Sequence, residues 1–431
     1  MHHVCAAWVN VFLLAAAATR AAALITIPLE HQEVPMVINN VTVAQKTAYF
    51  GKIFVGEPAH QAFTVVFDTG SGHLILPSVK CDEEACLGKQ RYDAAASSSA
   101  LAVNRSGGLA EITDQNRKRE RLTVTFGIGS VTGELVSESV CLLDPAEHGR
   151  PAAGCTSRLP MVMATSMSKD PFKSFKFDGV LGLGLSPLSL KQDFNFFGVM
   201  AGQHAGSFEH KFGLFLSADP RTPSEISFGG YDREHCGSPV NWTPVNRPEL
   251  GYWQISIKSI RIGDQALPMC DAGDCKAIMD TGTSLLGVPR SELRTVHKSL
   301  ARALPKDHGE VDCREVAGPP IVFDLGSFSV ELTAADYSRM GTASMLVAGG
   351  GPKEKRDFCR ASLLPVDLGK SPLGSKVFVF GEPVLRRYYT VFDAGKKQVG
   401  FARARRRSGN GGHAAKLPQD LGSTPAGSTV V

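Results

Sequence analysis

Two short segments of the sequence carry the same residues at the same offsets. Residues 67–77 (FDTGSGHLILP) align without gaps on residues 279–289 (MDTGTSLLGVP), so that Asp, Thr, Gly, Leu and Pro recur at identical positions. Each Asp-Thr-Gly follows a short apolar run that is typical of a buried strand entering a turn. A carboxyl group buried at the end of such a strand is costly unless the protein needs it. The repeat therefore indicates that Asp68 and Asp280 are functional.

A matched pair of Asp residues can hydrolyse a peptide bond. Two equivalent turns suggest a pseudo-twofold arrangement that brings both carboxyls together, and like charges about 3 Å apart cannot both ionise. The pair then holds one proton over a range of acidic pH. One Asp takes a proton from a water that attacks the peptide carbonyl. The other polarises that carbonyl and passes its proton to the leaving amine.

The residues that follow each Asp can support the carboxyls; they are Thr69, Gly70 and Ser71 in the first copy and Thr281, Gly282 and Thr283 in the second. The glycines let the backbone approach the carboxylate and offer N–H donors. The hydroxyls of Ser71 and Thr283 can donate to the outer carboxyl oxygens. The two threonines can bond across an interface between two halves of the molecule.

The rest of the chain also repeats, and it reads as β-rich. Apolar residues run into glycine at residues 180–184 (VLGLG) and again at residues 379–381 (VFG), downstream of the first and second Asp respectively. Short alternating runs separated by Gly, Pro, Asn and Asp fill the remainder, as expected of strands and turns. We therefore predict an all-β protein with an N-terminal lobe of residues 47–225 and a C-terminal lobe of residues 226–404.

These motifs resemble those of the pepsin-like aspartic proteases over residues 47–404. Besides the two turns, the landmarks are YFGKI at 49–53, FGIGSVTG at 126–133, FDGVLGL at 177–183, GYWQI at 251–255 and RYYTVFD at 387–393. The resemblance implies a bilobal fold of two pseudo-twofold-related, β-barrel-like lobes with an active-site cleft between them. It also implies catalysis by Asp68 and Asp280, protein or peptide substrates, inhibition by pepstatin-type compounds, a monomer, and no metal or other cofactor.

Cysteine usage fits an oxidising compartment. Nine cysteines follow Cys5, and neither tight pair has a neighbouring His or second CxxC at zinc spacing. The resemblance implies three disulfides: Cys81–Cys86, Cys270–Cys275 and Cys313–Cys359. The pairing of the other three cysteines stays open: Cys141 and Cys155 can form an extra bridge, which leaves Cys236 free.

The sequence departs from the family pattern at the hairpin flap that closes over the cleft. Phe126 stands where the family usually has Tyr, and Ile75 stands where the family has the Trp that this Tyr meets. Both polar partners are absent together, so neither is left buried and unpaired. We expect a flap of Phe126, Gly127 and Ile128 that closes by apolar contact, with altered water ordering and lower turnover. An apolar cleft in turn suggests hydrophobic side chains around the cleaved bond.

The N-terminus reads as a secretory signal. Residues 4–18 are apolar except for Asn10, and three alanines at 21–23 supply a cleavage site, which predicts a signal peptide over residues 1–23. A short presegment, residues 24–46, follows, and it has no Lys or Arg before residue 46. Family zymogens often block the cleft with a longer, Lys-bearing prosegment. Autoinhibition therefore works differently here, or the enzyme is made active.

Composition limits the remaining possibilities. A net charge of +4 is too small to imply nucleic-acid binding, and no later apolar stretch is long enough for stable membrane insertion. The Gly-, Ser- and Pro-rich residues 405–431 predict a disordered tail. Sequons at Asn40, Asn104 and Asn241 predict glycosylation of a protein that is secreted or sent to an acidic vacuole or lysosome-like compartment.

Two functions of different class fit these observations. The first is an aspartic endopeptidase that acts at acidic pH. The alternative is a catalytically impaired, pepsin-fold binding protein, because one fold can carry many functions. Both Asp-Thr-Gly motifs are intact, which favours the active enzyme.

Overall fold

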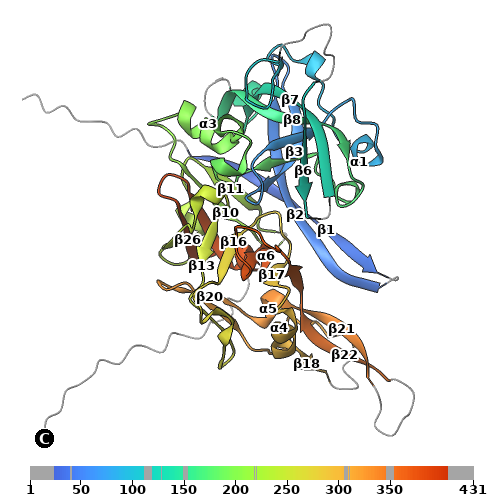
Figure 1. Ribbon diagram of the computed structural model, residues 1–431, viewed down its shortest axis with the longest axis vertical. Helices are drawn as coiled ribbons and strands as arrows, with labels where there is room; N and C mark the ends of the chain where they lie inside the picture. The colour runs from blue at the N-terminus through green and yellow to red at the C-terminus, as the bar shows by residue number, and fades with distance from the viewer. Residues whose placement is uncertain are drawn as a thin grey trace, which may run out of the picture.

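The computed structural model describes residues 24–38, 41–110, 119–127, 129–148, 154–217, 219, 221–304, 309, 311–345 and 354–405. The predicted signal peptide, residues 406–431 of the predicted tail, Asn40 and Ile128 lie outside these residues. The described chain is mostly strand with a few short helices, and two lobes lie one above the other along its long axis (Figure 1). The predicted all-β, bilobal fold is confirmed.

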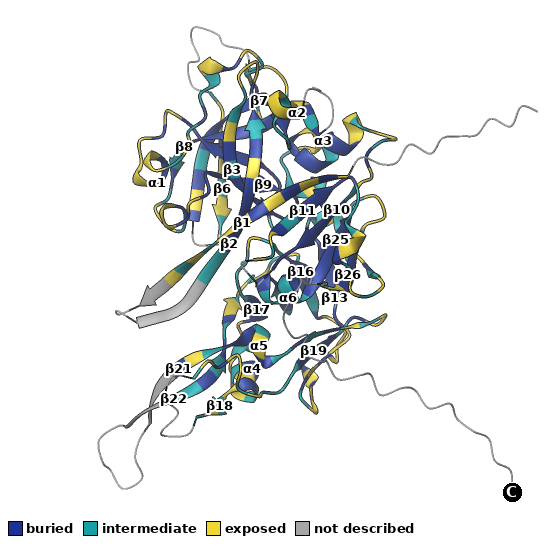
Figure 2. Ribbon diagram, turned by 180° about the vertical axis from the view of Figure 1, so that it is seen from behind, coloured by how far each residue is buried: buried dark blue, intermediate teal, exposed yellow. Residues whose placement is uncertain are grey.

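A single 14-stranded sheet runs from the middle of the molecule into the N-terminal lobe (Figure 1). One part of this sheet is shared by the two lobes, because its strands come from the start, the middle and the end of the chain. Their order is β12 (Asn241–Pro244), β26 (Gln398–Arg403), β25 (Tyr388–Asp393), β10 (Lys211–Phe215), β11 (Ser224–Phe228) and β1 (Ile25–Ile38). Most residues of β10, β11, β25 and β26 are buried (Figure 2). The predicted boundary at residue 225 falls within β11.

The rest of this sheet forms the N-terminal lobe. Its strands are β2 (Val41–Val55), β3 (Gln61–Asp68), β9 (Gly179–Gly182), β4 (Leu74–Pro77), β8 (Cys155–Met167), β7 (Gly129–Cys141), β5 (Leu101–Ala102) and β6 (Arg121–Phe126), which pairs with β7. Its short helices are α1 (Glu84–Leu87), α2 (Pro145–His148) and α3 (Phe196–Gln203). The hairpin of β6 and β7 is the expected flap.

Three smaller sheets form the C-terminal lobe. The first contains β13 (Gln254–Ser256), β16 (Lys276–Met279), β24 (Val377–Phe380), β17 (Leu286–Pro289) and β23 (Leu363–Val366). The second contains β15 (Gln265–Leu267), β14 (Ser259–Ile262), β19 (Ile321–Asp324) and β20 (Ser329–Leu332), and the third β18 (Arg302–Ala303), β22 (Glu354–Ala361) and β21 (Ser338–Met345). The helices are α4 (Leu293–Leu300), α5 (Ala334–Tyr337) and α6 (Glu382–Arg387).

Short 3-10 turns connect these elements in the described residues: η1 (Ala94–Ala96), η2 (Phe172–Ser174), η3 (Ser186–Leu188), η4 (Gln192–Phe194), η5 (Arg233–His235), η6 (Pro248–Leu250) and η7 (Pro268–Cys270). No helix of the described chain is both long and apolar enough to cross a membrane.

The two sequence repeats fold in the same way. In the N-terminal lobe β3 pairs in parallel with β9, which places Asp68 opposite Gly182, and β9 pairs antiparallel with β4. In the C-terminal lobe β16 pairs in parallel with β24, which places Met279 opposite Phe380, and β24 pairs antiparallel with β17. Each Asp-Thr-Gly turn therefore links the two outer strands of a matching three-stranded unit, with the downstream repeat between them.

The predicted presegment is built into the sheet. Residues 25–29 of β1 pair with β11 on one side of the sheet, and residues 30–38 pair with β2. Ile25, Ile27 and Leu29 are buried and alternate with exposed neighbours, as a half-buried strand requires. This segment is thus an internal strand between the two lobes.

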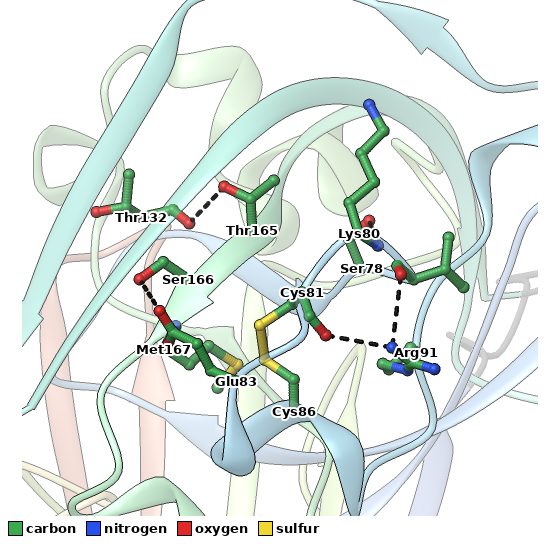
Figure 3. The surroundings of a disulfide bond; sticks show 11 residues. Ser78, Lys80, Cys81, Glu83, Cys86, Arg91, Thr132, Thr165, Ser166 and Met167 are labelled. Carbon is green, nitrogen blue, oxygen red and sulfur yellow. Dashed lines mark hydrogen bonds between the residues drawn. A yellow bond between two sulfur atoms is a disulfide. The ribbon is translucent and has the colours of Figure 1, made fainter.

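Four disulfides close loops in the two lobes: Cys81–Cys86, Cys141–Cys155, Cys270–Cys275 and Cys313–Cys359. Cys236 is free. Figure 3 shows the loop closed by Cys81–Cys86, where Glu83 accepts hydrogen bonds from the Ser166 hydroxyl (2.8 Å) and from the Met167 N–H (2.7 Å) at the end of β8. Arg91 donates to the Cys81 carbonyl over 3.2 Å. The loop is thereby anchored to the end of β8 that pairs with the flap strand β7.

We predict that β1 cannot be removed without loss of the fold. A chain that begins at Val41 loses three buried side chains, each worth roughly 2 kcal/mol, and exposes the edge of β11. Thermal unfolding and circular dichroism should show an unstable or unfolded product. Removal of residues 406–431 is the matched control and should leave the unfolding temperature unchanged. A stably folded chain from Val41 would show that β1 is dispensable.

Candidate active site

Both Asp carboxyls are held by the turn in which they occur. Asp68 is the last residue of β3, and Asp280 directly follows β16. The N–H of Gly70 donates to Asp68 Oδ1 over 3.0 Å, and the N–H of Gly282 donates to Asp280 Oδ1 over 2.8 Å. These equivalent hydrogen bonds fix the orientation of each carboxylate from within its own turn.

The two carboxyls face each other across the lobe interface. A Cβ atom on Gly70 would lie 3.0 Å from the Asp280 Cγ, and one on Gly282 would lie 2.7 Å from the Asp68 Oδ1. Each glycine therefore packs against the carboxyl of the opposite turn, where a side chain would force the two turns apart. The structure brings together all the residues that the repeat singled out.

The two threonines connect the turns. The Thr69 N–H donates to the Thr281 hydroxyl oxygen over 2.9 Å, and the Thr281 N–H donates to the Thr69 hydroxyl oxygen over 3.0 Å. Each hydroxyl then donates across the interface, from Thr69 to the Met279 carbonyl over 2.8 Å and from Thr281 to the Phe67 carbonyl. Because Thr69 is fully buried, these bonds are shielded from water and hold the two Asp residues in one geometry.

The two turns differ at the residue that follows the glycine, which is Ser71 in the first turn and Thr283 in the second. The Thr283 hydroxyl donates to Asp280 Oδ2 over 2.7 Å. The Ser71 hydroxyl lies beside Asp68 and lowers the pKa of that carboxyl, but it makes no hydrogen bond of ordinary geometry to a described residue. A hydroxyl that donates to a carboxylate favours its charged form, so Asp280 is better supported as an anion.

The environment of Asp68 favours its protonated form. Burial raises the pKa of the Asp68 carboxyl above its ordinary range, and the neighbouring Asp280 raises it further. Asp68 is 8% exposed, so water provides little screening of the two charges. The pair therefore retains one proton at a pH where isolated carboxyls have lost theirs.

Tyr252 also belongs to the site, although the sequence offered it only as part of the GYWQI landmark. Burial raises the pKa of its hydroxyl, and the charges of Asp280 and then Asp68 raise it further, which places the ring near both carboxyls. The turn before it needs glycine: Gly251 has φ +82°, and an added Cβ would lie 2.3 Å from the Leu188 backbone nitrogen. The position of Tyr252 near the Asp68–Asp280 pair, called the dyad below, could not be derived from sequence spacing.

Ser284 is a further residue that sequence analysis did not single out. Its hydroxyl donates to the Thr47 carbonyl over 2.8 Å and accepts from the Thr47 N–H over 2.9 Å. These bonds tie β2 to the second Asp-Thr-Gly turn. The only signal in the sequence is the position of Ser284 directly after Thr283.

The flap is apolar on the side that faces the N-terminal lobe. Phe126 is half-buried and meets Phe172 edge-on, with 5.7 Å between the ring centroids. It packs against the apolar cluster that contains the buried Ile75. Gly127 turns the hairpin with φ +50°, and Ile128 lies outside the described residues. No Tyr–Trp pair is needed for this packing.

His73 lies just beyond the first turn and is kept neutral. It is 8% exposed, and its Nε2 accepts a hydrogen bond from the Leu190 N–H over 3.0 Å. Burial lowers the pKa of its imidazole from 6.5 to about 4. Protonation would remove the acceptor and place a charge in an apolar setting.

The described residues contain one group of possible metal ligands, and it lies outside the two turns. Glu225 of β11, Asp232 and His235 of η5 place one ligand atom each within 4.8 Å of one another. His235 Nε2 lies 3.0 Å from Glu225 Oε1, so an ion pair accounts for the group. The residues around the dyad offer no comparable set of ligands.

Comparison with known proteins places these features in one family. A family model described as eukaryotic aspartyl protease matches residues 48–404. The chain is 31% identical to cathepsin E of Rattus norvegicus over 364 residues, which cover 83% of this chain and 80% of that protein. It is 31% identical to cathepsin D of Clupea harengus over 384 residues (88% and 85%) and 30% identical to pepsin A of Suncus murinus over 357 residues (82% and 80%).

The geometry of His73 predicts a loss of stability in acid. Because the folded protein binds this proton less tightly than the unfolded chain, His73 contributes stability above pH 6.5 that is lost as the pH falls toward 4. This decrease in the pKa of His73 corresponds to roughly 3 kcal/mol of unfolding free energy. In His73→Asn, urea unfolding between pH 7 and pH 4 should show a smaller decline than in the parent protein. Exposed His210→Asn is the control, and equal declines in all three proteins would contradict the prediction.

Proposed function

Because the chain belongs to the eukaryotic aspartyl protease family and is an aspartic endopeptidase, we propose that it cleaves proteins at acidic pH by a water activated between Asp68 and Asp280. The observation that carries this proposal is the mutual packing of each turn glycine against the opposite carboxyl. Threonine bonds on both sides of the interface hold that arrangement. The dyad is therefore preorganised before substrate binds.

The unequal surroundings of the two carboxyls assign their roles. Asp280, which accepts the Thr283 hydroxyl, is the ionised base and takes a proton from the water as its oxygen attacks the peptide carbonyl carbon. Asp68, which burial favours as the acid, gives its proton to the carbonyl oxygen. Collapse of the tetrahedral intermediate breaks the C–N bond. The nitrogen then receives the proton held by Asp280, and Asp68 regains its own from the intermediate.

The raised pKa of Asp68 fixes the direction of the pH dependence. Activity requires one proton on the dyad, so it declines as rising pH removes that proton and also declines when strong acid protonates both carboxyls. The retained proton keeps activity across mildly acidic pH. We accordingly propose an acidic optimum.

Substrates are protein or peptide segments with apolar side chains around the cleaved bond. Phe126 supplies an apolar surface at the flap, and Tyr252 supplies an aromatic surface beside the dyad. Four disulfides support passage through an oxidising secretory compartment. We propose that the monomer is secreted or enters an acidic compartment, with exposed Asn241 as a glycosylation site. In the described residues no observation favours an impaired binding protein, because each turn keeps the glycine hydrogen bond to its own Asp and the threonine bonds to the other turn.

The test is cleavage of a quenched peptide with a Phe–Phe centre across about pH 3–7, with and without pepstatin. Asp280→Asn should lower kcat/KM by at least about a thousandfold, because it removes the base. It should also raise the unfolding temperature near neutral pH, since the Asp68 carboxylate no longer faces a second charge. An active Asp280→Asn enzyme, or folded parent protein without activity at any pH, would refute the proposed function.

The apolar flap makes a separate prediction. Phe126→Tyr keeps the ring and its edge-on contact with Phe172, so kcat/KM should stay within about threefold of the parent value. Phe126→Ala removes the contact and should lower kcat/KM by about tenfold, which corresponds to roughly 1.4 kcal/mol of lost apolar contact. Steady-state kinetics on the same peptide measures both. An unchanged Phe126→Ala enzyme would show that this ring does not close the flap.

A further inference from the structure

Two arginines of the C-terminal lobe lie directly opposite each other on neighbouring strands. Arg339 of β21 is the register partner of Arg360 of β22, in the hairpin that projects from the lower lobe in Figure 1. Side chains at such positions share a face of the sheet with their Cβ atoms about 5 Å apart, and like charges there are destabilising. The pair therefore needs an explanation that strand pairing does not supply.

Neither arginine has a carboxylate partner among the side chains that the structure describes. The Nε and Nη1 atoms of Arg339 and the Nε atom of Arg360 are buried without a hydrogen-bond partner. Arg302, on adjacent β18, also has an unpartnered Nε, but both of its Nη atoms have acceptors within the protein: they donate to the carbonyls of Val316 and Cys313 and to the Ser338 hydroxyl. Buried donors of a cation that lack acceptors cost free energy, which an anion would recover.

His297 completes the group from the helix that packs against β22. Helix α4 contacts β22, and burial lowers the pKa of the His297 imidazole, which the nearby charges of Arg360 and Arg339 lower further. The other charged residues of α4, Arg294 and Lys298, are exposed and also basic. Glu292, at the start of α4, contacts the Ser291 hydroxyl. Asp357 of β22 projects from the opposite face of the strand, three positions from Arg360, and has an interaction of its own.

Arg360 has room to lie flat on the sheet. A Cβ atom on Gly341, the residue two positions after Arg339, would lie 2.8 Å from the Arg360 Cδ and 2.9 Å from its Nε. The absence of a side chain at residue 341 thus leaves space for the guanidinium of Arg360 beside that of Arg339. Burial lowers the pKa of Arg339 to about 10, and Arg360 contributes to that decrease. Among the side chains that the structure describes, none supplies a carboxylate that offsets this repulsion.

We propose that Arg339, Arg360 and His297 form a binding site for an oxyanion, namely a phosphate or sulfate group, in the C-terminal lobe. Guanidinium groups offer planar pairs of N–H donors that match the oxygens of such a group. A bound oxyanion favours the protonated form of His297, so binding is tighter in acid. The site uses no residue of the dyad and does not depend on the proposed peptidase activity.

The first test is thermal unfolding of the mature protein in sodium phosphate, sodium sulfate or sodium chloride of equal ionic strength, at about pH 5 and pH 7.5. Phosphate or sulfate should raise the unfolding temperature in a saturable manner, since a ligand that binds only the folded state stabilises it. The apparent Kd should be at least about threefold lower at pH 5, and His297→Asn should remove that difference. Equal effects of the three salts would overturn the proposal.

Substitutions of the two arginines distinguish an anion-binding site from a pair of arginines that only stabilises the fold. Arg339→Gln and Arg360→Gln should each weaken phosphate binding by at least about tenfold, while exposed Arg261→Gln in the same lobe should not change it. In chloride alone both variants should unfold at the parent temperature or higher, because repulsion between the arginines is relieved. Lower unfolding temperatures in chloride would show that the arginines already have a partner within the protein and would overturn the site.

The source of the oxyanion is a separate question for the same assay. A short peptide that contains phosphoserine, compared with its unphosphorylated form, tests a modified macromolecule against the free ion. Binding of inorganic phosphate alone supports a free ion, and tighter binding of the phosphopeptide supports a macromolecular ligand. Binding of neither, in protein whose parent and variant forms are folded, overturns the proposal.

Discussion

The pair of reciprocal threonine bonds at the lobe interface is the constraint on which the rest of the molecule depends. A carboxyl group becomes a proton donor at acidic pH only if a second carboxyl stays close, yet two such groups repel each other. Thr69, which is fully buried, and Thr281, which is half-buried, hold the turns together through reciprocal hydrogen bonds. The shared sheet adds a second connection between the lobes that carry the two turns.

The two three-stranded units that carry the Asp-Thr-Gly turns match in backbone pairing but differ in side chains. The alignment of the two turns sets Ser71 against Thr283 and His73 against Leu285. The first difference leaves one carboxyl better stabilised as an anion, and the second places a neutral imidazole beside only one of the turns. A symmetric scaffold thereby supports two groups with different protonation, which acid–base catalysis requires.

Much of this arrangement could be predicted from the sequence because its signals are local. The repeated turns, their apolar strands and the downstream glycines identified the fold and the paired carboxyls, since each is a short pattern with a direct physical meaning. The roles of Tyr252, Ser284 and the arginine pair could not be predicted, because they follow from contacts between segments far apart in the chain. The position of β1 could not be predicted either, because a short apolar segment after a predicted signal peptide gives no indication of its partner strands.

The shared sheet has a consequence for how the protein is made. Its neighbouring strands come from the start, the middle and the end of the chain, with β1 paired to β11 and β10 paired to β25. Contacts so distant in sequence form slowly. During translation the N-terminal lobe emerges long before β25 and β26, so the edge of β10 stays unpaired until synthesis is nearly complete. The edge of β10 is therefore exposed from synthesis of residue 215 until β25, which ends at residue 393, has been made.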